Sequence, residues 1–170
     1  MKGWNFMKRK LNSFLLVMIL VVTCVCIRPI TAIAATSSSV TSRTAMSLAL
    51  EPGRTGSSNS ISFKFNGLPD NAMVDSIKID CTDAKKIGNG MGAIAPMSLT
   101  ITNPDGIIQT VQWGSGNVTN TDVFDDFSAK GTWQIRMTGR NVAPITAGSR
   151  FVAGVKYSNV KMTITYYIEN

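Results

Sequence analysis

The chain has 170 residues, of which 17 are Lys or Arg, 10 are Asp or Glu and none is His. Without histidine, a single chain cannot supply Ser-His-Asp or Cys-His catalysis, a histidine-ligated zinc or an imidazole acid–base step. The net charge of +7 comes mainly from residues 1–34, which hold five basic side chains and no acidic one. The other 136 residues carry 12 basic and 10 acidic side chains, and this balance does not indicate nucleic-acid binding.

Residues 1–34 have the three parts of a cleaved secretory signal. A basic start precedes an uncharged apolar stretch over 14–27, which is shorter than the ~20 residues of a stable membrane-spanning helix. Ala32-Ile33-Ala34 then offers small residues at alternate positions. We predict cleavage between Ala34 and Ala35, and a secreted or extracellular protein, with association with the cell surface as an option. An uncleaved signal anchor and a lipoprotein acylated within the apolar stretch are the alternatives.

After the signal, residues 35–43 are rich in Ser and Thr and have little to bury, so we predict a flexible N-terminal arm. Residues 44–170 are enough for one domain with its own core. Cys81 is the only cysteine in this domain, so no internal disulfide is expected. Alternation places Cys81 on the same face as Ile77 and Ile79, which predicts a buried, unreactive thiol.

From Met46 onward, apolar residues recur at every second position, which is the pattern of half-buried strands. The predicted strands cover 46–50, 61–65, 77–81, 97–101, 107–113, 133–137, 151–157 and 160–168. Asn103-Pro104-Asp105-Gly106 predicts a tight turn between two of them. Residues 82–96, 114–131 and 139–148 are predicted loops, and a short helical turn over 83–87 is an option within the first.

About eight short antiparallel strands, each with one apolar face, favour two packed sheets or a barrel. We predict an all-β fold, an antiparallel β-sandwich of jelly-roll type. Trp113 and Trp133 could serve as sugar-stacking platforms, but both are in phase with the inward residues of their strands. Core packing is therefore the preferred interpretation of both side chains.

Several consecutive motifs have a specific counterpart. The run MSLTITNPDG, a hairpin reaching Trp113, the loop VFDDFSAKG and the strand GTWQIRMT resemble the P domain of subtilisin-like proprotein convertases and its bacterial relatives. Upstream, GLPDNAMVDSIKID resembles the approach to that family's first paired strands. The resemblance implies a jelly-roll sandwich that serves as an accessory module beside a protease.

The segment 114–131 carries the candidate metal ligands. Calcium prefers several oxygen ligands held by flexible backbone, and Asn120, Asp122, Asp125 and Asp126 offer them within seven residues. An ordinary polar loop, with acids that cap turns and pair with Lys130, is the alternative. Asp122, Asp125 and Asp126 are also the candidates for a catalytic carboxylate pair.

Two function classes follow. The first, which we prefer, is a secreted non-catalytic module, apparently of bacterial type, that binds an extracellular or cell-surface glycan or protein or has a structural role. The second is a secreted, glycosidase-like hydrolase that uses the carboxylates of 114–131. We predict that 114–131 and 82–96 form the partner-facing rim, because long loops carry no obligatory core pattern. No nucleic acid, no membrane contact after signal cleavage and no cofactor other than calcium are expected, and the oligomeric state is left open.

Overall fold

The computed structural model describes residues 35–88, 93–143 and 152–169, all within one compact unit. The predicted signal, residues 1–34, lies outside the described residues. Within them, no helix is long and apolar enough to cross a membrane.

Twelve strands and one three-residue 3-10 turn make up the regular structure of the described residues. The strands are β1 (Thr36–Thr41), β2 (Met46–Leu50), β3 (Thr55–Ser57), β4 (Ile61–Lys64), β5 (Ala72–Asp80), β6 (Ala84–Ile87), β7 (Ile94–Thr102), β8 (Ile108–Gln112), β9 (Val118–Thr121), β10 (Thr132–Asn141), β11 (Ala153–Tyr157) and β12 (Lys161–Ile168). Every pairing between them is antiparallel. The predicted antiparallel β-sandwich is confirmed, with more strands than the sequence indicated.

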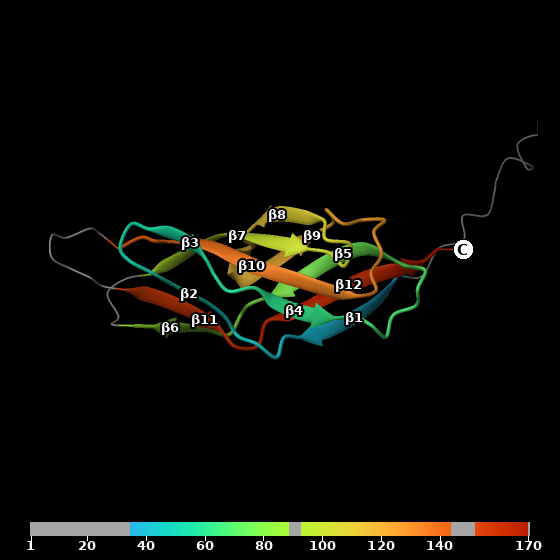
Figure 1. Ribbon diagram of the computed structural model, residues 1–170, viewed down its shortest axis with the longest axis horizontal. Helices are drawn as coiled ribbons and strands as arrows, with labels where there is room; N and C mark the ends of the chain where they lie inside the picture. Colours follow the sequence, from blue (N-terminus) through green and yellow to red (C-terminus); the bar gives the residue numbers. More distant parts are fainter. Residues whose placement is uncertain (1–34, 89–92, 144–151, 170) are drawn as a thin grey trace, which may run out of the picture. The chain divides into compact units, whose positions relative to one another are not determined.

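The strands form three hydrogen-bonded sheets (Figure 1). A four-stranded sheet has the order β1-β12-β5-β9, and a three-stranded sheet has the order β2-β11-β6. In the five-stranded sheet, β3-β10-β7-β8 form the main path, and β4 also pairs with β10. Strand β4 pairs with Thr132–Ile135 of β10 and β3 with Thr138–Arg140, so the two share one edge of that long strand.

The four- and three-stranded sheets are successive parts of one bent layer. Strand β1 continues into β2, β5 into β6, and β11 into β12, and the order of these strands is the same in both sheets. We call the line of interruption, formed by residues 42–45, 81–83 and 158–160, the crease. At the crease, Oδ2 of Asp83 accepts hydrogen bonds from the backbone N–H groups of Ser158 (3.1 Å) and Asn159 (2.7 Å). This carboxylate therefore joins the β5–β6 link to the β11–β12 link.

The core is built from the inward residues of the alternating strands. Trp133 is fully buried, its Nε1 donates to the carbonyl oxygen of Ala129 at 3.0 Å, and its ring lies edge-on to Phe124. Cys81, directly after β5, is buried and free, which confirms its predicted inward position. The other large buried side chains are Met46, Ile61, Phe63, Ile77, Ile79, Leu99, Ile101, Ile135, Met137 and Tyr157.

The prediction of a flexible arm over 35–43 is wrong for most of its length. Residues Thr36–Thr41 form β1, an edge strand paired with β12 over six residues. Hydroxyl groups bridge the two strands, with Ser39 Oγ lying 2.8 Å from Thr163 Oγ1. Backbone pairing and hydroxyl contacts hold this segment, and they leave no apolar periodicity in the sequence.

Two predicted loops also contain strands. In 82–96, residues Ala84–Ile87 form β6, not a helical turn, and β7 begins at Ile94. In 114–131, residues Val118–Thr121 form β9 on the edge of β5. Strand β10 runs on to Asn141, into the predicted loop 139–148, of which 144–148 lie outside the described residues. Strands β6 and β9 have a neighbour on one side only, so little of either is apolar.

Candidate functional site

The predicted calcium ligands lie on the surface at the end of β9. Asn120 is an exposed residue of that strand, and Asp122, Asp125 and Asp126 follow in a turn. The turn is anchored from below, because Phe124 is buried and the backbone N–H of Asp126 donates to the carbonyl oxygen of Val74 at 3.0 Å. Segment 114–131 is thus anchored on the sandwich, and its role as a partner-facing rim stays a prediction from the sequence.

The acidic side chains of this turn do not gather in one place. The Asp126 carboxylate accepts a hydrogen bond from the Tyr167 hydroxyl, and this bond raises the pKa of Tyr167 to about 12. Lys130 pairs with Asp70 at 2.6 Å, not with the acids of the turn. Among the described residues, no three acidic or cysteine side chains lie close enough to hold a metal. Calcium binding stays a prediction from the sequence.

Neither tryptophan of the domain presents a free face typical of a sugar platform. Trp133 is buried, as described above. Trp113 is half-buried against the core, its Nε1 donates to Oδ1 of Asn117 at 3.1 Å, and its ring lies 5.6 Å from that of Tyr157. The core-packing interpretation of both residues is confirmed.

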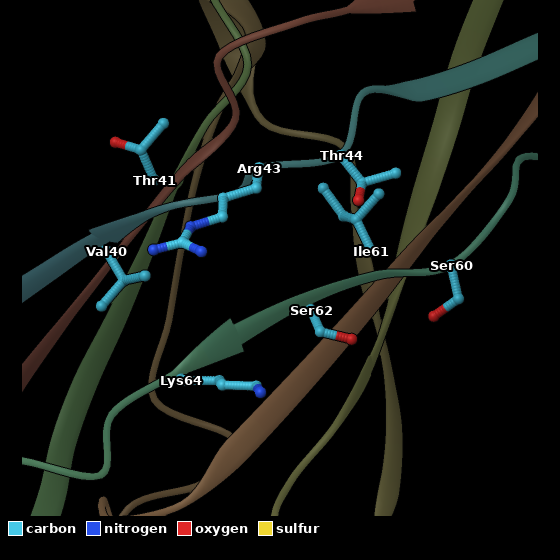
Figure 2. A pocket seen from close by; sticks show the side chains of 8 residues that line it. All are labelled: Val40, Thr41, Arg43, Thr44, Ser60, Ile61, Ser62 and Lys64. Carbon is cyan, nitrogen blue, oxygen red and sulfur yellow. The ribbon is translucent and has the colours of Figure 1, made fainter.

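The structure shows a groove that the sequence did not predict. It lies between β1 and β4, the edge strands of two different sheets, and encloses a volume of about 560 Å³ (Figure 2). We call it the β1–β4 groove. Its lining residues are Val40, Thr41, Arg43, Thr44, Ser60, Ile61, Ser62 and Lys64.

Two cations and several hydroxyl groups line this groove, and among the described residues no carboxylate does. In Figure 2, the Arg43 guanidinium extends from the β1 side toward the space between the strands, and the Lys64 side chain projects from the end of β4. The one ion pair among the described residues is Lys130–Asp70, so neither groove cation is neutralised by a described carboxylate. Val40 and the buried Ile61 give the groove an apolar part.

A smaller hollow of about 280 Å³ lies beside the groove on the outer face of the five-stranded sheet. It is lined by residues of β7, β8 and β10 and shares Ser60 with the groove. Arg136 is its cation. Ser60 donates to Oε1 of Gln134 at 3.3 Å, which ties the wall between the two hollows to β10.

Sequence reasoning missed the groove because its walls are remote in the chain. The alternation of Ile61, Phe63 and Phe65 does place Lys64 on the outward face of its strand. No local sequence pattern relates Lys64 to Arg43, which lies in the segment predicted to be a flexible arm. Only the strand character of Thr36–Thr41 brings Arg43 to a fixed position opposite β4.

Cys81, the one cysteine among the described residues, offers no alternative site. Burial raises the pKa of the Cys81 thiol to about 12, with Asp80 and Asp83 as smaller contributors. The thiol is therefore protonated at physiological pH and is a poor nucleophile.

No protein-family model matches this chain, and no curated protein sequence matches it either. Solved structures with some similarity include FlhE, with 14% identity and a TM-score of 0.41 over 79% of this chain and 100% of that one. A predicted secreted protein from Eubacterium rectale has 12% identity and a TM-score of 0.48, with 80% of this chain but 40% of that one covered. TmCBM61, solved with β-1,4-galactotriose, has 12% identity and a TM-score of 0.29 over 68% of each chain. Because all three TM-scores are below 0.5, these similarities do not bear on what this chain binds.

Proposed function

We propose that this chain is a secreted, non-catalytic binding module that recognises an anionic group of an extracellular or cell-surface glycan or protein in the β1–β4 groove. The observation that carries the proposal is the pair of cations, Arg43 and Lys64, that faces this groove without a described carboxylate partner. The signal-like pattern of residues 1–34 supports secretion.

The groove has the size and chemistry of a ligand site. A volume of about 560 Å³ is within the usual range for small-ligand pockets. Arginine offers a planar fork that matches a carboxylate, lysine adds a mobile point charge, and hydrogen bonds in which one partner is charged are the stronger ones. The hydroxyls of Thr41, Thr44 and Ser62 add donors and acceptors for the remaining polar atoms of a ligand.

Several observations support a non-catalytic role. The sequence holds no histidine, and no carboxylate of the described part of the chain lines the groove, where it could act as a general acid or base. The acids at 122–126 lie in a turn anchored on the core, with Asp126 bonded to Tyr167. The resemblance of 67–138 to P domains also agrees with an accessory module.

The proposal is tested by binding of anionic probes to protein produced from the full-length sequence. Calorimetric titration with an oligogalacturonate and with an acidic peptide should show binding of at least one, weakened by added salt because the contact is ionic. The double variant Arg43→Gln/Lys64→Gln should bind about tenfold more weakly or worse. A matched control, Arg54→Gln/Lys85→Gln, removes the same charge at exposed positions that line neither hollow and should bind within about threefold of the unmodified protein. Equal affinities of the two double variants, or no binding of either probe, would refute the proposal.

A further inference from the structure

Both walls of the β1–β4 groove are strand edges with a neighbour on one side only. Among the described residues, β1 pairs with β12 alone and β4 with β10 alone. The far edge of such a strand presents unpaired N–H and C=O groups, and another extended chain can pair with them. The groove therefore offers backbone hydrogen bonds in addition to its charges.

The register identifies which backbone groups face the groove. The N–H of Phe65 donates to the carbonyl oxygen of Gly131 at 2.8 Å. The preceding residue, Lys64, lies opposite Thr132. In an antiparallel pair, alternate residues bond to the partner strand. The backbone groups of Ser62 and Lys64 therefore point away from β10, toward the groove.

The same reasoning applies to the opposite wall. The N–H of Ser42 donates to the carbonyl oxygen of Val160 at 2.8 Å, so Val40 bonds to β12 while Ser39 and Thr41 direct their backbone groups outward. The close approach of the Ser39 and Thr163 hydroxyls agrees with this assignment, because side chains lie closest in the pairs that are not hydrogen-bonded.

We propose that the ligand of the groove is an extended acidic peptide segment that adds as a further strand to the free edge of β4. This inference rests on the proposed function and specifies the class of its ligand. Backbone bonds to Ser62 and Lys64 hold the peptide in register, its carboxylates meet Lys64, and Arg43 adds positive charge on the opposite wall. Addition of a strand to an open sheet edge is a general mode of peptide recognition.

The geometry also sets the sequence pattern of the peptide. Ser62 and Lys64 have exposed side chains, and Ile61 and Phe63 are buried. A peptide residue opposite Lys64 has its side chain on the same outer face, where a glutamate completes a cross-strand ion pair. Its neighbours face inward, toward Val40 and Ile61, where apolar side chains fit. The recognised segment therefore alternates acidic and apolar residues.

The edge strand β6 differs from β4 in its charges. Strand β6 carries Lys85 and Lys86 in succession, and all four of its residues are exposed. Lysines on an exposed edge discourage pairing with other chains. In β4, the only charged residue is Lys64 at the end of the strand, where it lines the same groove as Arg43 and can attract an acidic partner.

The test uses a capped hexapeptide of alternating glutamate and valine and two isomers that carry backbone N-methyl groups. In the expected register, glutamate N–H groups donate to β4, and valine N–H groups point away. Methylation of the glutamate nitrogens should weaken calorimetric binding by at least about tenfold, since it removes backbone hydrogen bonds, whereas methylation of the valine nitrogens should change it by less than about threefold. Equal binding of all three peptides would show attraction by charge alone and overturn the inference.

A protein variant gives a second readout. Ser62→Pro removes the N–H that faces the groove without removing a bond to β10, and proline is tolerated on the solvent side of an edge strand. It should reduce peptide binding as strongly as methylation of the glutamates does, and more strongly than Ser62→Ala, which keeps the backbone N–H and removes only the hydroxyl. If Ser62→Pro does not fold, as judged by its melting curve, the methylated peptides still decide the question.

The outcomes also separate this inference from the proposed function. Binding of oligogalacturonate but not of the hexapeptide, lost in Arg43→Gln/Lys64→Gln, would overturn the peptide inference and leave the anion-binding groove in place. Failure of both probes to bind would overturn the two proposals together. Hexapeptide binding that is sensitive to glutamate methylation and to Ser62→Pro supports both.

Discussion

The substitution Trp133→Ala tests the centre of the sandwich. Trp133 is 0% exposed and lies near the start of β10. Its indole Nε1 donates to the carbonyl oxygen of Ala129 at 3.0 Å, and its ring meets Phe124 edge-on, with 5.2 Å between ring centroids and an interplanar angle of 88°. Removal of the indole therefore deletes a large apolar contact surface, an aromatic pair and one buried hydrogen bond.

The expected loss of unfolding free energy is large. Truncation of a buried tryptophan to alanine costs about 3–5 kcal/mol, because the transfer free energy of the ring is lost and a cavity is left behind. The carbonyl of Ala129 also loses its donor, and a hydrogen bond of this kind contributes about 1 kcal/mol. Since a small domain has a total stability of only about 5–15 kcal/mol, this variant should unfold at a much lower urea concentration.

Urea titration followed by circular dichroism measures the effect. Trp133→Phe keeps much of the apolar volume and loses the hydrogen bond, so it should cost less than Trp133→Ala. Trp113→Ala is the matched control, because Trp113 is half-buried and should cost about 2 kcal/mol or less. A loss below about 1 kcal/mol for Trp133→Ala would contradict the buried position and revive a role for this ring at the surface.

Two further predictions concern the crease. Burial raises the pKa of Cys81 to about 12, so its thiol is protonated at pH 8. Iodoacetamide should therefore label Cys81 only after denaturation, as peptide mass spectrometry would show. Labelling of the native protein as fast as that of free glutathione would disprove the burial. Asp83→Ala removes the acceptor of two backbone N–H groups and should lower the unfolding free energy by about 2 kcal/mol in a urea titration. Asp83→Asn keeps one accepting oxygen and should lose less, and an Asp83→Ala variant as stable as the unmodified protein would show that the crease is held by its strands alone.

The sequence predicted the strands that carry core residues. Strands β2, β4, β5, β7, β10 and β12 alternate apolar and polar side chains because each packs one face on the core, and this alternation is visible without a structure. The inward positions of Cys81 and Trp133 followed from the same pattern and are confirmed. The turn at 103–106 followed from its Pro and Gly, and Gly106 does have a positive φ of 82°.

The strands that the sequence failed to predict are mainly edge strands. All four residues of β6 are exposed, and β1 is Thr-Ser-Ser-Ser-Val-Thr with no buried residue. Such strands are held by backbone pairing on one side and by hydroxyl contacts, neither of which leaves a hydrophobic period. Strand β9 has one buried residue, Thr119, whose Oγ1 accepts a hydrogen bond from the backbone N–H of Gly114 at 2.9 Å. Sequence patterns detect core contacts, and these strands make few.

The same failure hid the candidate site. The sequence predicts that Arg43 lies in a flexible arm, so it gives no reason to expect Arg43 and Lys64 in the same groove. The sequence predicts a calcium site at the acidic turn instead, because the oxygen ligands of that turn are close together in the sequence. Binding sites built from two strand edges depend on tertiary pairing, and a local motif search does not detect them.

The short length of β4 determines how its free edge can contribute to affinity. Ser62 and Lys64 offer two N–H and two C=O groups, and four net hydrogen bonds of about 0.5–1.5 kcal/mol each supply only about 2–6 kcal/mol. Association itself costs about 4–15 kcal/mol of translational and rotational freedom, so backbone pairing alone gives no measurable complex. The ionic contacts of Arg43 and Lys64 and the apolar contacts of Val40 and Ile61 must provide the remainder. The edge would then set the direction and register of a peptide, while these four side chains would decide which peptide binds.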